Sequence, residues 1–171
     1  DFNKYIRYEK RNVAAYINRG TSYLYLKDTA RAFQDYDLAI RTNREDPDAY
    51  NRRGALLMEQ RRYDEAFADF DMAVKCDSAY IPGYFNRALV NNYLRRPMAS
   101  IRDFDRVVEL DSTSSLGYFN RAIVRTEIGD YNRALEDFNL VARYSPDNVL
   151  LYYNRALLNT RLGEIDDAIA D

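Results

Sequence analysis

The hydrophobic and polar positions of this chain follow a pattern that recurs every 34 residues. In each 34-residue segment, an aromatic residue at position 4 is followed four residues later by a small residue, as in Tyr118 and Ala122. A second small residue at position 20 precedes an aromatic residue at position 24, as in Ala134 and Phe138. Because residues three or four apart share one face of an α-helix, the pattern predicts two helices per segment, packed through their small residues.

A strict period of this length is the sequence signature of a repeat protein. Position 4 is tyrosine in five successive segments: Tyr16, Tyr50, Tyr84, Tyr118 and Tyr152. The predicted repeats are 13–46, 47–80, 81–114 and 115–148, with a partial repeat at 149–171. Turn-forming residues near positions 15–17 predict a first helix at positions 2–14 and a second at 17–30 of each repeat. Residues 1–12 match the end of a second helix, so we interpret the chain as one solenoid domain cut from a longer array.

Composition narrows the classes of function. The chain is 47% hydrophobic and 30% charged, which is typical of a folded domain, and it has no apolar run long enough to insert into a membrane. Its net charge of −2, with both signs interleaved, argues against a nucleic-acid-binding surface. The sequence has no histidine and a single cysteine, and it contains no nucleophile–base set or phosphate loop. We therefore expect no catalytic site, no metal site and no cofactor.

Arginine and aspartate recur at fixed positions of the repeat. Position 7 is arginine and position 23 is aspartate in every repeat. In a helical hairpin that turns near position 15, these two positions lie at similar height on opposing helices. We therefore predict a structural ladder of ion pairs rather than a site for a ligand anion. The predicted pairs are Arg19 with Asp35, Arg53 with Asp69, Arg87 with Asp103, Arg121 with Asp137, and Arg155 with Asp171.

Asparagine recurs at position 6, away from the predicted packing side. The residues there are Asn18, Asn86, Asn120 and Asn154, with Arg52 in the second repeat. Positions 2, 5, 9, 12 and 13 share this side of the first helix and are expected to be exposed, Ile17 and Asn51 among them. Asparagine is a poor helix former, so its recurrence in mid-helix favours a role in binding, although local bonds to the backbone would also explain it.

The pattern resembles the tetratricopeptide repeat, in which an aromatic residue, Leu-Gly and Tyr are followed by Ala-x3-Phe and Pro over 34 residues. The resemblance covers essentially the whole chain and implies an all-α, right-handed superhelical solenoid of antiparallel helix-turn-helix repeats. The chain departs from it at position 7, which is arginine, and at position 11, where polar residues stand at Asn91, Arg125 and Asn159. In this family the first helices line a concave groove for peptides, and asparagines at position 6 bind the peptide main chain.

The resemblance therefore implies a protein–protein interaction scaffold that binds an extended peptide segment. The predicted groove residues are Asn18, Arg52, Asn86, Asn120, Asn154, Phe85, Phe119, Tyr153 and Tyr93. A clamp for a C-terminal carboxylate is not supported, because Asp48 stands where the family's clamp has a lysine.

Other interpretations stay open at this point. The main alternative is a structural array that spaces or oligomerises other domains, and binding of an aromatic or lipophilic small molecule is a third. Self-association is also predicted, through an apolar end surface that includes Leu150, Leu151 and Ile169.

Overall fold

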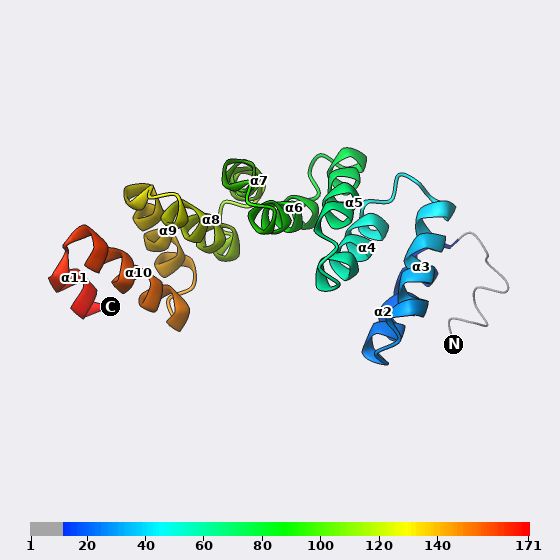
Figure 1. The fold of residues 1–171 in the computed structure, drawn as a ribbon, viewed down its shortest axis with the longest axis horizontal. Coiled ribbons are helices and arrows are strands. Elements are labelled where there is room, and N and C mark those ends of the chain that lie inside the picture. Colours follow the sequence, from blue (N-terminus) through cyan, green and yellow to red (C-terminus); the bar gives the residue numbers. More distant parts are fainter. Residues whose placement is uncertain (1–11) are drawn as a thin grey trace. The chain divides into compact units, whose positions relative to one another are not determined.

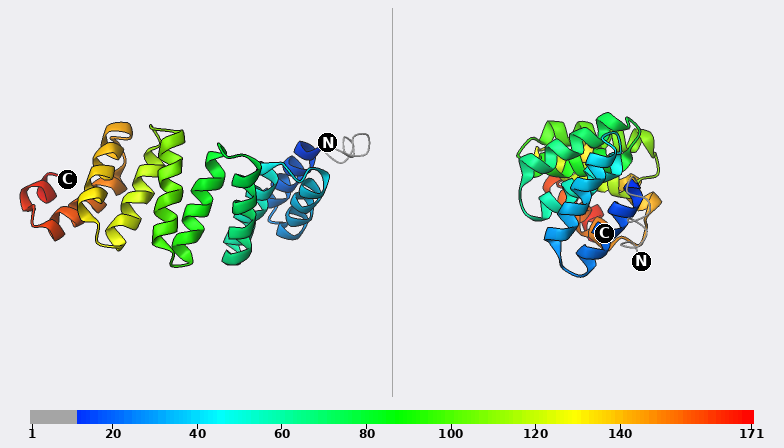
Figure 2. Two further views of the ribbon diagram at one scale, coloured as in Figure 1. Left: turned by 90° about the horizontal axis from the view of Figure 1, so that it is seen from above. Right: turned by 90° about the vertical axis from the view of Figure 1, so that its right-hand side faces the viewer.

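The computed structural model describes residues 12–171, which form paired helices and short turns without any strand (Figures 1 and 2). Each predicted repeat contains one pair, a first helix followed by a second helix. The pairs are α2 (Val13–Tyr25) with α3 (Thr29–Thr42), α4 (Pro47–Glu59) with α5 (Tyr63–Cys76), α6 (Ile81–Tyr93) with α7 (Pro97–Leu110), α8 (Ser115–Glu127) with α9 (Tyr131–Tyr144), and α10 (Val149–Leu162) with α11 (Ile165–Ala170). The helix predicted over residues 1–12 lies outside the described residues, apart from Asn12.

The chain divides into two compact units. The N-terminal unit ends at Val90 and its described part contains α2 to α5 and most of α6. The C-terminal unit begins at Asn91 and contains the end of α6 and α7 to α11. The boundary therefore falls within a helix, and the single solenoid domain proposed from the sequence stays a prediction.

The first helices begin one residue earlier than the sequence predicts, and a polar side chain caps the start of α2, α4, α8 and α10. Asn12, Asp46, Ser114 and Asn148 each accept a hydrogen bond from the backbone N–H three residues later. These residues occupy position 34 of the repeat, so the helix starts at position 1 of the next one. The polar segments between repeats thus end one helix and start the following one.

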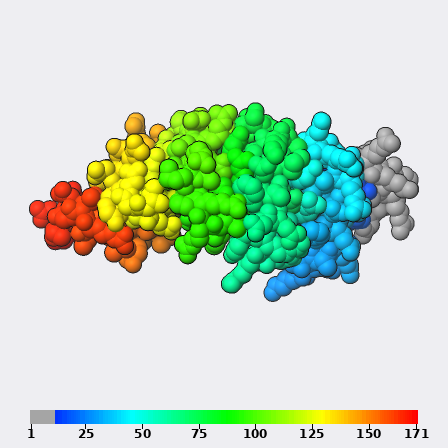
Figure 3. Space-filling model, turned by 45° about the horizontal axis from the view of Figure 1, so that its top comes forward, coloured from blue at the N-terminus to red at the C-terminus, as the bar shows by residue number. Residues whose placement is uncertain are grey.

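The turn inside each repeat places its position 15 in the left-handed region of backbone space. Lys27, Arg61 and Arg95 have φ values of 60°, 60° and 58°, and Gly129 and Gly163 have 82° and 84°. Glycine adopts this conformation without strain, whereas lysine and arginine do not. Their positive charges lie at a helix C-terminus, which offsets part of that cost. In the space-filling view, the segments around the first two turns, in blue and teal, project at the lower edge (Figure 3).

In the N-terminal unit, the small residue of the first helix faces the aromatic ring of the second. A Cβ on Gly20 would lie 2.8 Å from Cε1 of Tyr36, and one on Gly54 would lie 2.8 Å from Cε1 of Phe70. Tyr36 and Phe70 are 1% and 0% exposed. The helices of a repeat therefore approach each other at the positions that the sequence pattern predicts.

The C-terminal unit has an equivalent core, in which Phe138 and Val141 of α9 pack with Ala122 of α8 and with Leu151 and Leu158 of α10. Leu151 was expected on an exposed end surface, and this prediction is wrong, because the side chain is 0% exposed within this core.

Leu150 and Ile169, the other two residues expected on the apolar end surface, are exposed, unlike Leu151. Their exposed fractions are 63% and 78%. Self-association through them stays a prediction.

Candidate functional site

In four repeats, the guanidinium at position 7 donates two hydrogen bonds to the carboxylate at position 23, and we call this bidentate pair a fork. In the second repeat, Nε of Arg53 donates to Oδ2 of Asp69 at 2.8 Å, and Nη2 donates to Oδ1 at 2.7 Å. The same fork joins Arg19 to Asp35, Arg121 to Asp137 and Arg155 to Asp171. The remaining predicted pair, Arg87 with Asp103, would join the two units and stays a prediction.

The aspartates of these charged pairs are buried. Asp35, Asp69 and Asp137 are 3%, 5% and 1% exposed. The hydrogen bonds to Asp69 raise the pKa of Arg53, against the opposing effect of burial. A charged fork of this geometry holds two helices at a fixed distance. The position-7 arginines are therefore occupied with helix packing.

The position-7 arginines of the second to fifth repeats also bind an acceptor in the preceding repeat, a contact that was not predicted from the sequence. Nη1 of Arg53 donates to Oδ1 of Asp37 at 2.9 Å, and Asp37 lies on the second helix of the preceding repeat. Equivalent bonds join Arg87 to Asp71, Arg121 to Asp105 and Arg155 to Asn139, at 2.7, 2.7 and 2.9 Å. Arg53, Arg121 and Arg155 thus each connect two successive second helices. The signal in the sequence was the recurrence of Asp or Asn at position 25.

The position-4 tyrosine completes this arrangement. The guanidinium of Arg121 lies 5.3 Å from the ring centroid of Tyr118, one helical turn earlier, and three other repeats repeat this contact. The Tyr118 hydroxyl donates to the backbone oxygen of Ser112 at 3.3 Å, in the loop between repeats. The recurrent tyrosine and arginine therefore tie each first helix to the elements around it.

The departures at position 11 are explained by the same aspartates. Asn91 Nδ2 donates to Asp103 Oδ2 at 3.1 Å, and Arg125 Nη1 donates to Asp137 Oδ2 at 2.7 Å. Asn159 lies in the same way beside Asp171, with an N–O distance of 3.4 Å. A polar residue at position 11 thus provides a donor for the position-23 carboxylate of its own repeat.

The position-6 asparagines make mostly local hydrogen bonds. Nδ2 of Asn120 donates to the backbone oxygen of Leu116 at 2.9 Å, and Nδ2 of Asn154 donates to that of Leu150 at 2.7 Å.

The other side chains at position 6 differ. Asn18 is exposed, whereas Nδ2 of Asn86 donates to Oδ1 of the buried Asn51 at 2.8 Å. Arg52, which replaces asparagine in the second repeat, pairs with Asp48 at 3.2 Å.

Position 5 was expected to be exposed, and in the first two repeats this prediction is wrong. Ile17 and Asn51 are 6% and 8% exposed. Ile17 packs in one core cluster with Ala49 and Tyr50 of α4, so the next repeat covers it. Asn51 is likewise covered where Asn86 of α6 binds it.

The predicted aromatic contacts divide into two kinds. Phe85 and Phe119 are half-buried, and the Phe119 ring packs edge-on against Phe138 with centroids 5.8 Å apart. Tyr93 and Tyr153 are 59% and 63% exposed. Tyr93 and Tyr153 are therefore the two that offer a large surface to a ligand.

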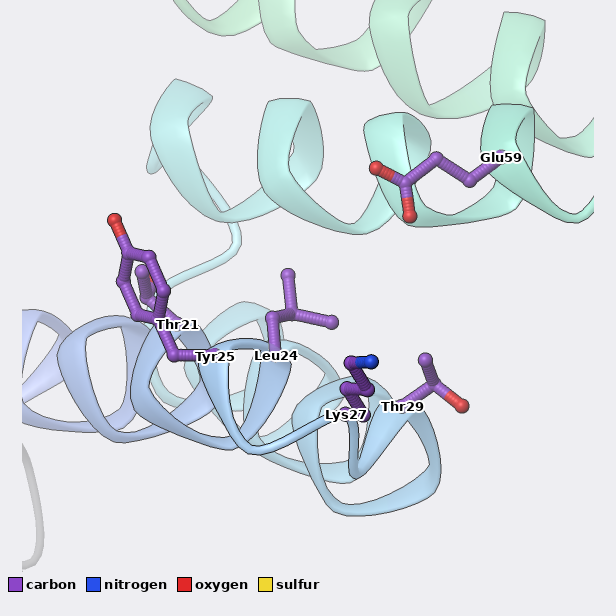
Figure 4. Close-up of a pocket in the computed structure, with 6 residues that line it drawn as sticks. All are labelled: Thr21, Leu24, Tyr25, Lys27, Thr29 and Glu59. Carbon is purple, nitrogen blue, oxygen red and sulfur yellow. The ribbon is translucent and has the colours of Figure 1, made fainter.

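A pocket of about 470 Å³ lies in the N-terminal unit, between the end of α2 and the end of α4 (Figure 4). It is lined by Thr21, Leu24, Tyr25, Lys27, Thr29 and Glu59. Its walls come from two successive repeats, and the repeat pattern of the sequence does not predict it.

A smaller pocket of about 220 Å³ lies in the C-terminal unit. Arg155, Asp171, Asn139 and Asn159 form much of its lining, so it belongs to the helix-joining network.

Over residues 12–171, no cluster of three or more acidic or cysteine side chains is arranged to hold a metal ion. No helix in this range is long and apolar enough to cross a membrane.

The family model described as tetratricopeptide repeat matches residues 17–81 and 119–171 of the chain. The comparison with curated proteins gave no match.

Several solved structures share the fold. YrrB, described as a TPR protein with an unusual peptide-binding site, is 22% identical, with a TM-score of 0.82 over 99% of this chain and 87% of that one. PilF of Pseudomonas aeruginosa is 19% identical, with a TM-score of 0.88 over 99% of this chain and 77% of that one. The first TPR of Spaghetti (RPAP3), bound to the HSP90 peptide SRMEEVD, is 20% identical, with a TM-score of 0.67 over 68% of this chain and 93% of that one. These likenesses establish an all-α helical-repeat fold.

Proposed function

The chain belongs to the tetratricopeptide repeat family, and on that premise we propose that it is a non-enzymatic scaffold whose first helices bind an extended peptide segment. Tetratricopeptide repeats are helical scaffolds for protein–protein interaction, and their proteins are generally non-enzymatic. Two solved structures with this fold, YrrB and the first TPR of Spaghetti, are described with a peptide-binding site or a bound peptide.

The observation that carries the proposal is the set of polar side chains at position 6 of the first helices. A carboxamide has two N–H donors and an oxygen that accepts two hydrogen bonds. Asn120 and Asn154 each use one N–H on their own helix, so each retains a donor and an acceptor. A peptide main chain offers the matching acceptor and donor. Tyr153, 63% exposed, adds apolar contact one residue away from Asn154.

Helix spacing restricts the ligand's conformation. Neighbouring helices pack about 8–10 Å apart, and an extended chain rises about 3.3 Å per residue. Successive first helices would therefore contact the peptide about every third residue. A ligand held mainly by its main chain is extended or polyproline-like and has a loose sequence preference.

The test uses a peptide selected from a random displayed library against the intact chain. Its affinity is measured by calorimetry for the parent and for the double variant Asn120→Ala, Asn154→Ala. Losing two hydrogen bonds of about 1 kcal/mol each is expected to weaken binding by about tenfold or more. Circular dichroism is expected to show unchanged or higher helicity, because alanine is the better helix former.

Asn132→Ala is the matched control, since Asn132 is an exposed asparagine on the second helix α9 and lies outside the proposed face. It is expected to leave the affinity unchanged. Equal affinity of the double variant and the parent would contradict the proposal. The local bonds of Asn120 and Asn154 would then be their whole role, and the spacer array would be the better description.

A further inference from the structure

We propose that the pocket between α2 and α4 receives a lysine or arginine side chain of the bound peptide. This inference rests on the proposed peptide-binding function and names one specificity site within it. The pocket is lined by the C-terminal turn of α2, the following turn and the last residue of α4 (Figure 4). Its volume of about 470 Å³ accommodates a long side chain together with part of the peptide backbone.

Glu59 gives the pocket a carboxylate that forms no ion pair with the described residues. Within residues 12–171, no cation lies within ion-pair distance of this exposed carboxylate. Glu59 is the last residue of α4, and α4 has no basic residue in its last turn. A carboxylate at the negative end of a helix is unfavourably placed. A bound cation would relieve that repulsion.

Tyr25 supplies the second element of a cation site. Its side chain is 85% exposed and lies on the opposite side of the pocket from Glu59 (Figure 4). The face of an aromatic ring attracts ammonium and guanidinium groups and disfavours anions. The same helix already shows this preference, because the Arg31 guanidinium lies 5.3 Å from the ring centroid of Tyr23.

The helix ends around the pocket also favour a cation. Both α2 and α4 end here, at Tyr25 and Glu59, so their negative ends line the pocket. The positive end of α3 is already capped, because Oδ1 of Asp28 accepts from the backbone N–H of Arg31 at 3.0 Å.

Lys27 is the opposing charge in the pocket lining. Its ammonium lies on a long flexible side chain, in the turn where its φ is 60°. No carboxylate of residues 12–171 lies within ion-pair distance of it, Glu59 included. An anionic ligand would pair with Lys27 but would face Glu59, the tyrosine ring and two negative helix ends. The cationic ligand is therefore the favoured one, and removal of Lys27 is expected to strengthen its binding.

The experiment is an NMR titration of the isotopically labelled chain with three blocked seven-residue peptides. They consist of alanine and proline and differ only in the central residue, which is arginine, norleucine or glutamate. The arginine peptide is expected to shift the backbone signals of Tyr25, Lys27 and Glu59 and to bind about fivefold more tightly than the norleucine peptide. Glu59→Gln is expected to remove that preference, and Lys27→Gln is expected to increase it.

Glu127→Gln is the matched control, because Glu127 is the last residue of α8 in the other unit and occupies the same repeat position. It is expected to leave the preference unchanged. The inference is overturned by equal binding of the arginine and norleucine peptides, by a preference for the glutamate peptide, or by no shift at the pocket. In each of these cases, weakening of the library-selected peptide by the Asn120 and Asn154 variants would still support the proposed function.

Discussion

Replacing Asp137 by alanine removes the acceptor of three charged hydrogen bonds in the core of the C-terminal unit. Arg121 donates to this carboxylate from Nε at 2.9 Å and from Nη2 at 2.6 Å, and Arg125 donates from Nη1 at 2.7 Å. The two arginine side chains are 11% and 12% exposed, so water cannot readily replace the lost partner.

The expected loss of stability is about 4 kcal/mol, since breaking a buried ion pair by removing one partner costs about 3–5 kcal/mol. Arg121 keeps its bond to Asp105, which limits the cost. Asp35→Ala is the matched comparison at the same repeat position. It leaves a single arginine, Arg19, whose side chain is 20% exposed, and is expected to cost about 2 kcal/mol.

Urea denaturation followed by circular dichroism measures the loss of stability in the Asp137→Ala and Asp35→Ala variants. Hydrogen exchange of the α8 and α9 amides shows which part of the Asp137→Ala variant opens. A double-mutant cycle with Arg125→Leu measures the coupling between Asp137 and Arg125, and leucine is chosen because the second repeat carries a buried leucine, Leu57, at this position. The double variant is expected to recover about 2 kcal/mol relative to the sum of the single variants. The reasoning is refuted if Asp137→Ala unfolds at the urea concentration of the parent, or if Asp35→Ala costs as much.

Three further predictions concern single positions. Arg61 and Gly129 both have positive φ, which glycine adopts without strain. Arg61→Gly is therefore expected to raise stability by about 1 kcal/mol, and Gly129→Ala is expected to lower it by about as much. The urea midpoints of the two variants measure these changes. Asn86→Ala is expected to lower stability by about 1–3 kcal/mol by leaving the buried Asn51 oxygen without its donor, whereas Asn120→Ala is expected to change the thermal midpoint little. Burial, the Asp48 carboxylate and the hydrogen bond to it raise the pKa of Tyr80. The unfolded tyrosine ionises near pH 10, whereas folded Tyr80 keeps its proton to higher pH. The free energy of unfolding is therefore expected to fall as the pH rises above about 10. In urea titrations at different pH, Tyr80→Phe is expected to make that fall shallower.

Each of these has a contradicting outcome. Equal urea midpoints for Arg61→Gly and the parent would show that the arginine compensates fully for its backbone conformation. Equal stability of Asn86→Ala and Asn120→Ala would show that the Asn51 contact contributes nothing. An unchanged slope of stability against pH for Tyr80→Phe would assign the alkaline loss to other tyrosines.

The helices could be predicted from the sequence because the repeat places residues of fixed size at fixed positions. Gly20 is small because the ring of Tyr36 lies where its Cβ would be, and the same reason holds for Gly54 and Phe70. The fork from position 7 to position 23 followed from hairpin geometry alone. These features depend on two helices that are adjacent in the sequence, so their period determines their contacts.

Features that involve two repeats were harder to predict. The bond from Arg53 to Asp37 and the burial of Ile17 depend on how one hairpin packs on the next, which the period alone does not specify. The pocket at Tyr25 and Glu59 forms for the same reason, from the turns of two repeats. The bond from Asn120 to its own helix could not be distinguished beforehand from a binding role, because the same amide can do both.

The second acceptor of the position-7 arginine gives the array a direction. Each repeat carries its donor on the first helix and the acceptor for its successor on the second, as in Arg87 with Asp71 and Arg121 with Asp105. Every 34-residue copy thus holds both halves of the same connector, facing opposite ways. A gene that duplicated or deleted one whole copy would produce a chain in which each arginine again meets a side-chain oxygen of Asp or Asn. Length could therefore change by whole copies during evolution without any compensating substitution at the joints.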